Sequence, residues 1–452
     1  MTPADLAAAV RPAVLDLMDR LRAADHAAYV VGGSLRDLLL GREPHDWDLT
    51  TDARPDRLQE LFPDSLYENA FGTVTVRDAT GVPVEITTFR SDHDYADYRR
   101  PRRIEFGDRV EDDLARRDFT FNALAWGGTA GMGRALVDPF GGREDIVRRV
   151  LRAVGDPGER FEEDALRMLR AVRLGAMLEF AIEPATLAAI GSHTELAAHL
   201  SGERIAAEVD KLLGARRPSV GLRLMADTGL LAVVAPELAA QIGVPQNKTP
   251  GEDLWDHTLR TVDAAAEAGS DGVVRLAALL HDIGKPATAA DGHFYGHEAV
   301  GAELAAKLLR RWHLPRETIE RVEHLVRFHM FAYDESWSDA AVRRFIGKVG
   351  IESLDDLFGL READNIGSGV SAAAGNLAAL RRRAAAELAA HVVLDRAGLA
   401  IDGNDLIAAL GLAPGPAIGR VLDRLVEKVV VEPQLNERGT LLALARSIAE
   451  DG

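Results

Sequence analysis

Strand-forming patterns occupy only the first third of this chain of 452 residues. β-rich runs such as "YVVGG", "WDLTT", "GTVTVR" and "VEITTF" lie between Tyr29 and about Gly127, mixed with short helical runs such as "LRDLLLG" and "RPDRLQELF". From Asp164 almost to the end, apolar residues recur at helical spacing, and the strand signal disappears after about residue 146. We therefore expect an α+β fold, in which an N-terminal domain with a mixed sheet precedes regions built of helices alone.

Breaks in these patterns divide the chain into four expected parts. The α+β domain spans residues 1–150, a helical segment 151–220, a larger helical domain 221–370 and a C-terminal helical region 371–452. Residues 4–24, ahead of the first strand, are expected to form one amphipathic helix. A chain of this length typically holds about two to four domains.

Composition excludes several classes of protein. The apolar content of 47% and the charged content of 27% are those of a globular protein, and no stretch reaches the roughly 18 apolar residues of a membrane span. The chain has no cysteine, which excludes disulfides and thiolate metal sites; with no secretory signal visible, we expect a cytoplasmic protein without a membrane partner. The net charge of −18 argues against a uniformly basic nucleic-acid binder, although local cationic patches can still contact phosphates.

A glycine turn and three carboxylates suggest a first site. The turn at Gly33 and Ser34 follows a strand and opens a helix, where backbone N–H groups can hold a phosphate. Asp46 and Asp48 alternate with apolar residues, so on a strand both would point to one side, and Glu85 lies on another β-rich run. A solvated strand edge would explain the aspartates alone. Three carboxylates beside a phosphate-binding turn instead favour hard divalent cations, with Mg²⁺ the natural choice beside a nucleotide.

The stretch "GGSLRD…DWD" resembles the first motif of nucleotidyltransferases of the polymerase-β superfamily, most closely the class II branch that holds bacterial CCA-adding tRNA nucleotidyltransferases and poly(A) polymerases. Further stretches resemble the flexible loop and the second to fifth motifs of that family, in family order: "TTFRSDHDYADYRRPRRIEF", "ARRDFTFNALA", "DPFGG", "EEDALRMLRAVRLG" and "ERIAAEV". The resemblance covers roughly residues 28–213. It implies a polymerase-β-like head, followed by a helical neck that recognises the base and binds RNA.

The resemblance also implies roles for individual residues. Asp46, Asp48 and Glu85 would be the catalytic carboxylates, with both aspartates as Mg²⁺ ligands. The residues expected to bind the nucleotide are Gly33, Ser34, Arg36, Arg116, Asp118, Asn122, Asp164, Arg167 and Arg170. Among them, those of the second motif, Arg116, Asp118 and Asn122, would hold the sugar and phosphates.

Three of these residues stand at i, i+3 and i+6 of "EEDALRMLRAVR", near one face of an expected helix: Asp164, Arg167 and Arg170. From spacing alone, an Asp–Arg pair that decorates the helix is the simpler interpretation. The resemblance implies instead that Asp164 and Arg167 read the base. A carboxylate beside a guanidinium matches the amino donor and ring-nitrogen acceptor of C and A and mismatches U and G, and such a bidentate contact discriminates by about 1–3 kcal/mol.

The expected function is template-independent addition of C and A to the 3′ end of tRNA, with tRNA, CTP and ATP as partners. The stretch "NAFGTVTV" resembles the CCA-adding form, and the loop from Tyr95 to Pro101, which enzymes adding only CC typically lack, is present. An enzyme that adds only the final A, or a poly(A) polymerase, remains an alternative.

Histidines and aspartates suggest a second, separate site. His257, the His281-Asp282 doublet and Asp364 match the order of the HD phosphohydrolase signature. His297 and His329 add two ligands of the type that support a second metal. Imidazole and carboxylate without thiolate suit Mn, Ni, Fe, Co, Zn or Mg, so a divalent transition metal or Mg²⁺ is expected without further identification.

The remaining residues near this signature are less informative. Lys285 could hold a phosphate or simply follow a turn, and His293, His313 and His324 are interpreted as structural. We expect a metal-dependent phosphodiesterase or phosphatase activity in addition to the transferase. Two readings from other classes are a nucleotide or cyclic-phosphate hydrolase with an RNA-binding head, and a non-catalytic tRNA-binding protein. Three converging carboxylates argue against both, because a binding module has no need of them.

Overall fold

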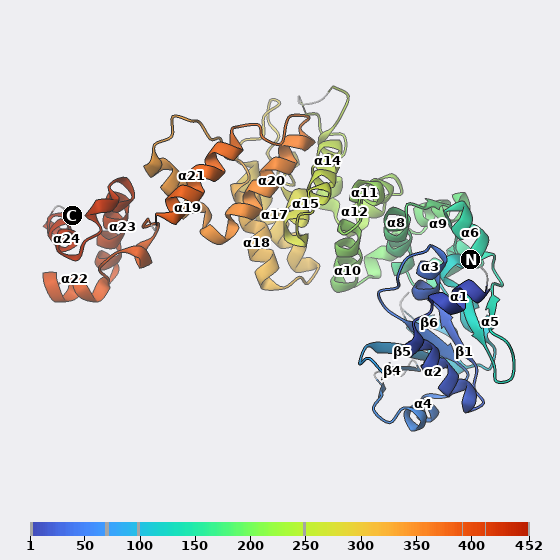
Figure 1. Ribbon diagram of the computed structural model, residues 1–452. Coiled ribbons are helices and arrows are strands. Elements are labelled where there is room, and N and C mark those ends of the chain that lie inside the picture. The colour runs from blue at the N-terminus through green and yellow to red at the C-terminus, as the bar shows by residue number, and fades with distance from the viewer. Residues whose placement is uncertain are drawn as a thin grey trace. The chain divides into compact units, whose positions relative to one another are not determined.

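The computed structural model describes residues 3–67, 72–96, 100–246, 250–390, 392–411 and 413–450, with the side chains of 3–4, 92–96 and 100–104 excepted. The chain forms two compact units, residues 1–239 and 240–452. Figure 1 shows the chain coloured from the N-terminus to the C-terminus. Among the described residues, every strand lies in the first unit. The expected α+β fold with helices in the second half is confirmed.

A seven-stranded mixed sheet forms the N-terminal part of the first unit, in the order β3-β4-β5-β2-β1-β8-β9. Strands β2 and β5 pair in parallel, and the other neighbours pair antiparallel. The strands are β1 Ala28–Val31, β2 Asp48–Thr51, β3 Leu66–Tyr67, β4 Thr73–Arg77, β5 Pro83–Thr88, β8 Ala125–Gly128 and β9 Ala135–Val137. A separate antiparallel hairpin joins β6 Arg90–Ala96 to β7 Arg100–Phe106. The predicted loop from Tyr95 to Pro101 falls here, partly outside the described residues.

Alternation in the sequence decides which side chains enter the core of the sheet. Val84 and Ile86 on β5 are buried, whereas Glu85 between them is exposed, as period-two alternation predicts. Helices α2 Pro12–Ala23 and α3 Gly32–Leu39 pack against β1. The buried strands therefore hold Glu85 on a face that is open to solvent.

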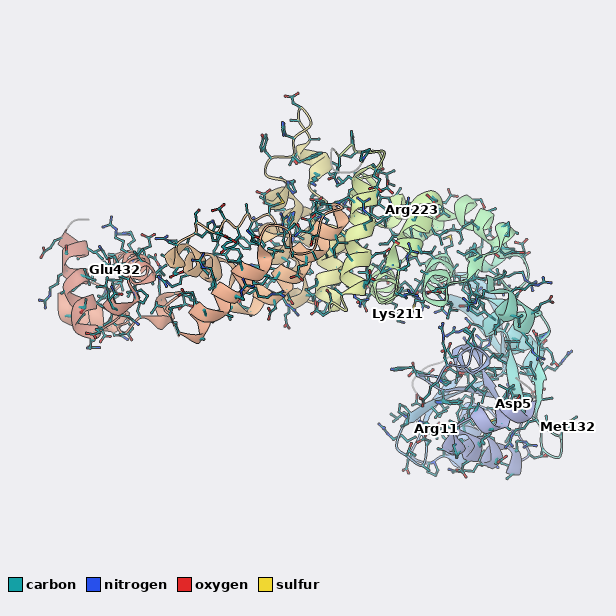
Figure 2. The ribbon with its side chains drawn as sticks, turned by 45° about the horizontal axis from the view of Figure 1, so that its top comes forward. Asp5, Arg11, Met132, Lys211, Arg223 and Glu432 are labelled. Carbon is teal, nitrogen blue, oxygen red and sulfur yellow. The ribbon has the colours of Figure 1, made fainter. Side chains whose placement is uncertain are left out.

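The N-terminal segment contains two helices where one was expected, α1 Pro3–Ala9 and α2. Pro12 has no N–H to donate within a helix and favours the first helical turn, so α2 begins there. Arg11, labelled in Figure 2, lies between the helices and forms an ion pair with the buried carboxylate of Asp78.

Short helices connect the strands of the sheet, and a run of helices completes the first unit. The remaining elements are α4 Pro55–Leu61, α5 Val110–Ala115, η1 Thr120–Asn122, α6 Gly142–Arg148, α7 Pro157–Glu163, α8 Leu166–Leu178, α9 Pro184–Ser192, η2 Thr194–His199, α10 Gly202–Leu213, α11 Pro218–Asp227, α12 Leu230–Val234 and α13 Pro236–Ala239. A short parallel ribbon of β10 Val150–Leu151 and β11 Ala181–Ile182 corrects the expectation that strands end near residue 146. Two-residue strands carry too few positions to show a period in the sequence.

The second unit is helical throughout its described residues. Its elements are α14 Leu254–Glu267, α15 Gly272–Leu280, α16 Lys285–Thr288, α17 His297–Arg311, α18 Arg316–Phe328, α19 Asp339–Val349, η3 Ile351–Ser353, α20 Leu354–Gly367, α21 Leu377–Ala389, η4 Arg396–Gly398, α22 Gly403–Leu410, α23 Pro416–Val431, η5 Pro433–Leu435 and α24 Arg438–Glu450. Asp253 and Asp256 form a capping box that starts α14. No helix in the described parts of either unit combines the length and apolar character that a membrane span requires.

Candidate functional site

The glycine turn between β1 and α3 has a conformation that only glycine adopts freely. Gly32 has φ of +67°, and a Cβ atom there would lie 2.8 Å from Nη1 of Arg117. Ser34 in the first turn of α3 donates to the carbonyl of Val31 at 2.8 Å and accepts from the backbone N–H of Asp48 at 3.3 Å. The turn is therefore tied to the start of β2, where the first catalytic candidate stands.

Two of the three predicted carboxylates stand on residues that are register partners in neighbouring strands. Asp48 opens β2, and Glu85 is its register partner on the parallel strand β5. Asp46 precedes the strand in a bend and its side chain is 87% exposed, which corrects the expectation that both aspartates extend from one strand. Among the described residues, the groups of three possible metal ligands with donor atoms within 4.8 Å of one another do not include Asp46, Asp48 or Glu85.

Charge near the turn is balanced between acids and arginines. Burial raises the pKa of Asp48 and Asp46 raises it further, while Arg117 and Arg36 act in the opposite direction. The net pKa of Asp48 is above its ordinary value, because a partly buried carboxylate beside another acid resists ionisation. Carboxylate oxygens in this setting suit a hard divalent cation, which would offset that cost.

Four predicted nucleotide-binding residues form one chain of hydrogen bonds. Arg170 on α8 donates to Oδ2 of Asp118 through two nitrogens, at 2.9 and 2.6 Å. Asn122 donates to Oδ1 of Asp118 at 3.0 Å and accepts from Nη1 of Arg36 at 3.0 Å. Burial raises the pKa of Asp118, but Arg170 and Asn122 outweigh burial, and the net pKa lies well below the ordinary value. The second motif is thereby fixed to both the glycine turn and helix α8.

Arg116 points to an aspartate that the sequence did not single out. It donates to Oδ1 of the fully buried Asp113 at 3.0 and 2.6 Å, and Arg117 donates to the other oxygen at 3.3 Å. The spacings of three and four residues from Asp113 on α5 to the arginines just after the helix were the signal that could have identified this pairing. Asp113 therefore positions both arginines of the doublet.

The base-reading candidates do not share one helix face. Asp164 ends α7 in an extended conformation, and α8 begins only at Leu166, whose N–H Asp164 accepts at 3.1 Å. Both oxygens of Asp164 accept from Nη2 of Arg204 on α10, at 3.0 and 2.8 Å. The sequence pattern could not reveal this break between α7 and α8, because "EEDALR" has the residue types and spacing of one continuous helix.

Arg167 has different partners from those that its spacing suggested. It donates to Glu163 at 2.5 Å and to the backbone carbonyl of Arg116 at 2.9 Å. The Asp164–Arg167 pair that spacing alone suggested does not form: Asp164 pairs with Arg204, and Arg167 pairs with Glu163. Arg204 lies in the fifth motif, so its position in that stretch was the available signal.

The third motif has a structural role in the described residues. Asp138 accepts from the backbone N–H groups of Gly142 and Arg143, at 2.7 and 3.1 Å, and so caps the start of α6. A Cβ on Gly142 would lie 2.1 Å from the carbonyl oxygen of Thr120. The glycine permits close contact between α6 and the second motif.

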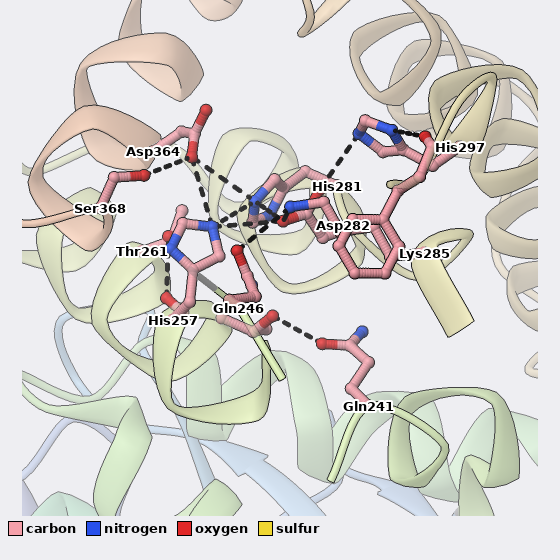
Figure 3. A network of polar contacts seen from close by, with 12 residues as sticks. Gln241, Gln246, His257, Thr261, His281, Asp282, Lys285, His297, Asp364 and Ser368 are labelled. Carbon is pink, nitrogen blue, oxygen red and sulfur yellow. Dashed lines mark hydrogen bonds and ion pairs between the residues drawn. The ribbon is translucent and has the colours of Figure 1, made fainter. Parts of the chain in front are cut away.

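The second site assembles all six predicted ligands from five helical segments of the second unit. Figure 3 shows most of them grouped around Asp282, and all six are buried. They are His257 on α14, His281 and Asp282 after α15, His297 at the start of α17, His329 after α18, and Asp364 on α20. Oδ2 of Asp282 lies 3.2 Å from Nε2 of His257 and 3.1 Å from Nε2 of His281.

The two oxygens of Asp282 face two different groups of histidines. Donor atoms of His257, His281 and Asp282 lie within 4.8 Å of one another, as do those of Asp282, His297 and His329. On the second side, Oδ1 lies 3.3 Å from Nε2 of His297 and 3.7 Å from Nε2 of His329. A single aspartate therefore joins two adjacent triads.

Backbone carbonyls fix the orientation of three of the imidazoles. Nδ1 of His281, His297 and His329 lies 2.8, 2.7 and 2.6 Å from the carbonyl oxygen three residues earlier. Nδ1 must donate there, which leaves Nε2 with a lone pair directed at the acid. Nε2 of His297 and Nε2 of His329 are buried without a hydrogen-bond partner among the described residues. Lone pairs that face a carboxylate in this way fit a bound cation.

Lys285 supplies a positive charge at the centre of this site. Its ammonium lies 2.6 Å from Oδ2 of Asp282 and is buried. Burial opposes ionisation of Asp282, but the adjacent Lys285 ammonium outweighs it and holds the pKa of Asp282 well below its ordinary value. Burial lowers the pKa of His281, so its imidazole favours the neutral form that binds metals.

Three family models match successive parts of the chain. The poly(A) polymerase head domain matches residues 28–152, the RNA- and SrmB-binding site of polymerase A matches 179–242, and tRNA nucleotidyltransferase domain 2 matches 298–445. The expected domain boundaries near residues 150, 220 and 370 stay predictions, because the matched ranges do not define where one domain ends and the next begins.

Relatives extend the similarity to nearly the whole chain. The CCA-adding enzyme of Geobacillus stearothermophilus is 34% identical over 433 residues, which cover 95% of both chains. The chain belongs to the family of CCA-adding enzymes. The CCA-adding enzyme of Lacticaseibacillus paracasei is 33% identical, with 97% of each chain covered.

Solved members of the CCA-adding family share the fold. The crystal structure of the Bacillus stearothermophilus enzyme in complex with CTP has a TM-score of 0.73 and 30% identity, and covers 98% of this chain and all of its own. The Thermotoga maritima enzyme complexed with tRNA has a TM-score of 0.58 at 20% identity and covers 98% of each chain, which shows the fold alone.

Proposed function

We propose that this chain adds C and A residues to the 3′ end of tRNA from CTP and ATP, without a template. The observation that carries the proposal is the register pairing of Asp48 with Glu85 beside the Gly32 turn, in a chain related over 95% of its length to a CCA-adding enzyme. The related structure in complex with CTP supports CTP as a substrate, and the match to tRNA nucleotidyltransferase domain 2 supports tRNA.

Asp48 and Glu85, with the exposed Asp46, would hold Mg²⁺. When bound, Mg²⁺ supplies charge neutralisation at the triphosphate and favours attack by the terminal hydroxyl of the tRNA. The α3 backbone N–H groups bind phosphate oxygens, and Arg36 and Arg117 add positive charge beside them.

Base selection is proposed to depend on Asp164 and Arg167. An ionised carboxylate has about four acceptor positions, and Asp164 uses three, two for Arg204 and one for Leu166. The remaining position can accept from the exocyclic amino group of C or A. Arg204 acts as the positioning residue, because it fixes the plane of the carboxylate.

Incubation of the protein with Mg²⁺, labelled CTP or ATP, and two tRNAs tests this proposal. One tRNA lacks CCA and the other lacks only the final A. A CCA-adding enzyme extends both to a single defined length. Extension of the second alone would identify an A-adding enzyme, and long A tails would identify a poly(A) polymerase. Failure to extend either tRNA would overturn the proposal.

A second function, metal-dependent phosphohydrolysis, is favoured by the two triads that share Asp282. Imidazole and carboxylate donors suit several divalent metals, which supply Lewis acidity to a phosphate ester when bound. Lys285 and Arg361, which both line the adjacent cleft, can bind phosphate oxygens. Arg361 donates to Asp364 at 2.8 Å, and its spacing of three residues on α20 was the signal for it.

Hydrolysis of phosphomonoesters and phosphodiesters by the protein, loaded in turn with Mn²⁺, Ni²⁺, Co²⁺ or Mg²⁺, tests the second function. We expect activity that a chelator removes and that His257→Ala abolishes. Hydrolysis that persists in His257→Ala at the wild-type rate would refute the assignment.

A further inference from the structure

A cleft of about 730 Å³ lies beside the paired triads in the second unit. Asp282, His297 and Asp364 line it, and so do the aromatic side chains of His293 and Tyr295. His293 was interpreted as structural from the sequence, and the structure places it in the lining of this cleft. The hydrolase chemistry proposed above uses neither aromatic ring.

A tight turn holds these aromatic residues in place. Ala290 and His293 exchange two backbone hydrogen bonds, of 3.0 and 2.9 Å, across Asp291 and Gly292. Both central residues have positive φ, +51° and +76°, as in the turns that close β-hairpins. The segment runs directly into His297 at the start of α17, so the turn and the predicted metal ligand share one short piece of chain.

Side chains alternate along this segment. Phe294 is half-buried, and the ammonium of Lys285 lies 5.5 Å from its ring centroid. His293 and Tyr295 on either side are exposed, and their rings stack with centroids 5.3 Å apart and an interplanar angle of 22°. Tyr295 is 81% exposed although it already packs against His293. The imidazole lies beside one face of the Tyr295 ring, and most of the ring stays open to a ligand.

We propose that Tyr295, backed by His293, is a stacking platform for a planar base, and that it makes the second site select phosphate esters that carry such a ring. This inference rests on the proposed hydrolase function. Stacking tolerates every base, because each has a π-face, so the platform selects for the presence of a base and not for its identity. The stacked imidazole holds the phenol ring in place, which lowers the entropy lost on binding.

Two pairs of substrates that differ only in the base test the platform. Adenosine 5′-phosphate is compared with ribose 5-phosphate, and adenosine 2′,3′-cyclic phosphate with its abasic ribose analogue, using the metal-loaded full chain. Tyr295→Ala should lower kcat/KM for the adenosine compounds by about ten- to a hundredfold, and should leave the abasic compounds within about twofold. Tyr295→Phe, which keeps the ring, should retain the wild-type preference.

Tyr67→Ala is the matched control, since it removes an exposed tyrosine from the other unit and should change neither rate. Equal losses on the adenosine and abasic compounds in Tyr295→Ala would overturn the platform and leave the hydrolase intact. If the wild-type chain hydrolyses none of the four compounds with any divalent metal, the hydrolase function fails, and the platform fails with it.

Discussion

Replacing Asp164 with alanine should relax the choice of base by the transferase. If the carboxylate accepts from the amino group of C or A, its loss breaks the bidentate contact and removes about 1–3 kcal/mol of discrimination. The preference for CTP and ATP over UTP and GTP should therefore fall by about ten- to a hundredfold, even if total activity also falls.

The contacts of Asp164 also predict a smaller loss of base preference when its partner Arg204 is replaced. Arg204→Ala removes both guanidinium bonds to Asp164, of 3.0 and 2.8 Å, but leaves the bond from the Leu166 N–H. Each of the paired side chains is about a fifth exposed, so solvent screens the pair and its worth is about 1 kcal/mol. We expect Arg204→Ala to lower the preference by about fivefold, less than Asp164→Ala.

The assay is competition among all four nucleotides on a tRNA that lacks CCA, with products separated by incorporated base. Arg216→Ala is the control, because it removes an exposed arginine of the same region that does not contact Asp164. An unchanged ratio of C and A to U and G in Asp164→Ala would refute the reasoning. The pair would then be an ion pair between helical segments, and its loss would appear only as a small decrease in thermal stability.

Three further results are expected. Asp48→Ala should abolish nucleotide addition while the melting temperature and any phosphate ester hydrolysis stay near wild type, and normal addition would refute its role as a ligand. His281→Ala should abolish chelator-sensitive hydrolysis and spare CTP incorporation, since the two sets of ligands lie in different units; loss of both activities in a folded variant would contradict that separation. Asp118→Asn should lower the free energy of unfolding by about 1–2 kcal/mol at pH 7, because Arg170 loses its charged partner but is a third exposed, so water screens part of the loss. The pKa of Asp118 is lowered by folding, so its contribution is present above pH about 4 and is lost as the pH falls further; denaturant melts should show the variant and wild type converging in acid.

Residue types and local spacing were sufficient for the class of fold, and the resemblance to known families supplied the candidate residues of both sites. Alternation on the β5 run placed Glu85 opposite Val84 and Ile86, and burial in the structure agrees with it. Four candidate ligands of the second unit came from the order of the HD phosphohydrolase signature, and the structure brings them together with His297 and His329. These inferences succeed because the period of a strand or helix is a property of a few consecutive residues.

The partner of each charged side chain was decided by tertiary structure. Asp164 pairs with Arg204 across 40 residues of sequence and not with Arg167 three residues away. Asp282 faces two triads because five helical segments converge on it, and the platform at Tyr295 depends on the turn that folds the chain back before α17. Which atoms meet across neighbouring elements depends on packing and register, and the spacing within any one segment contains no information about either.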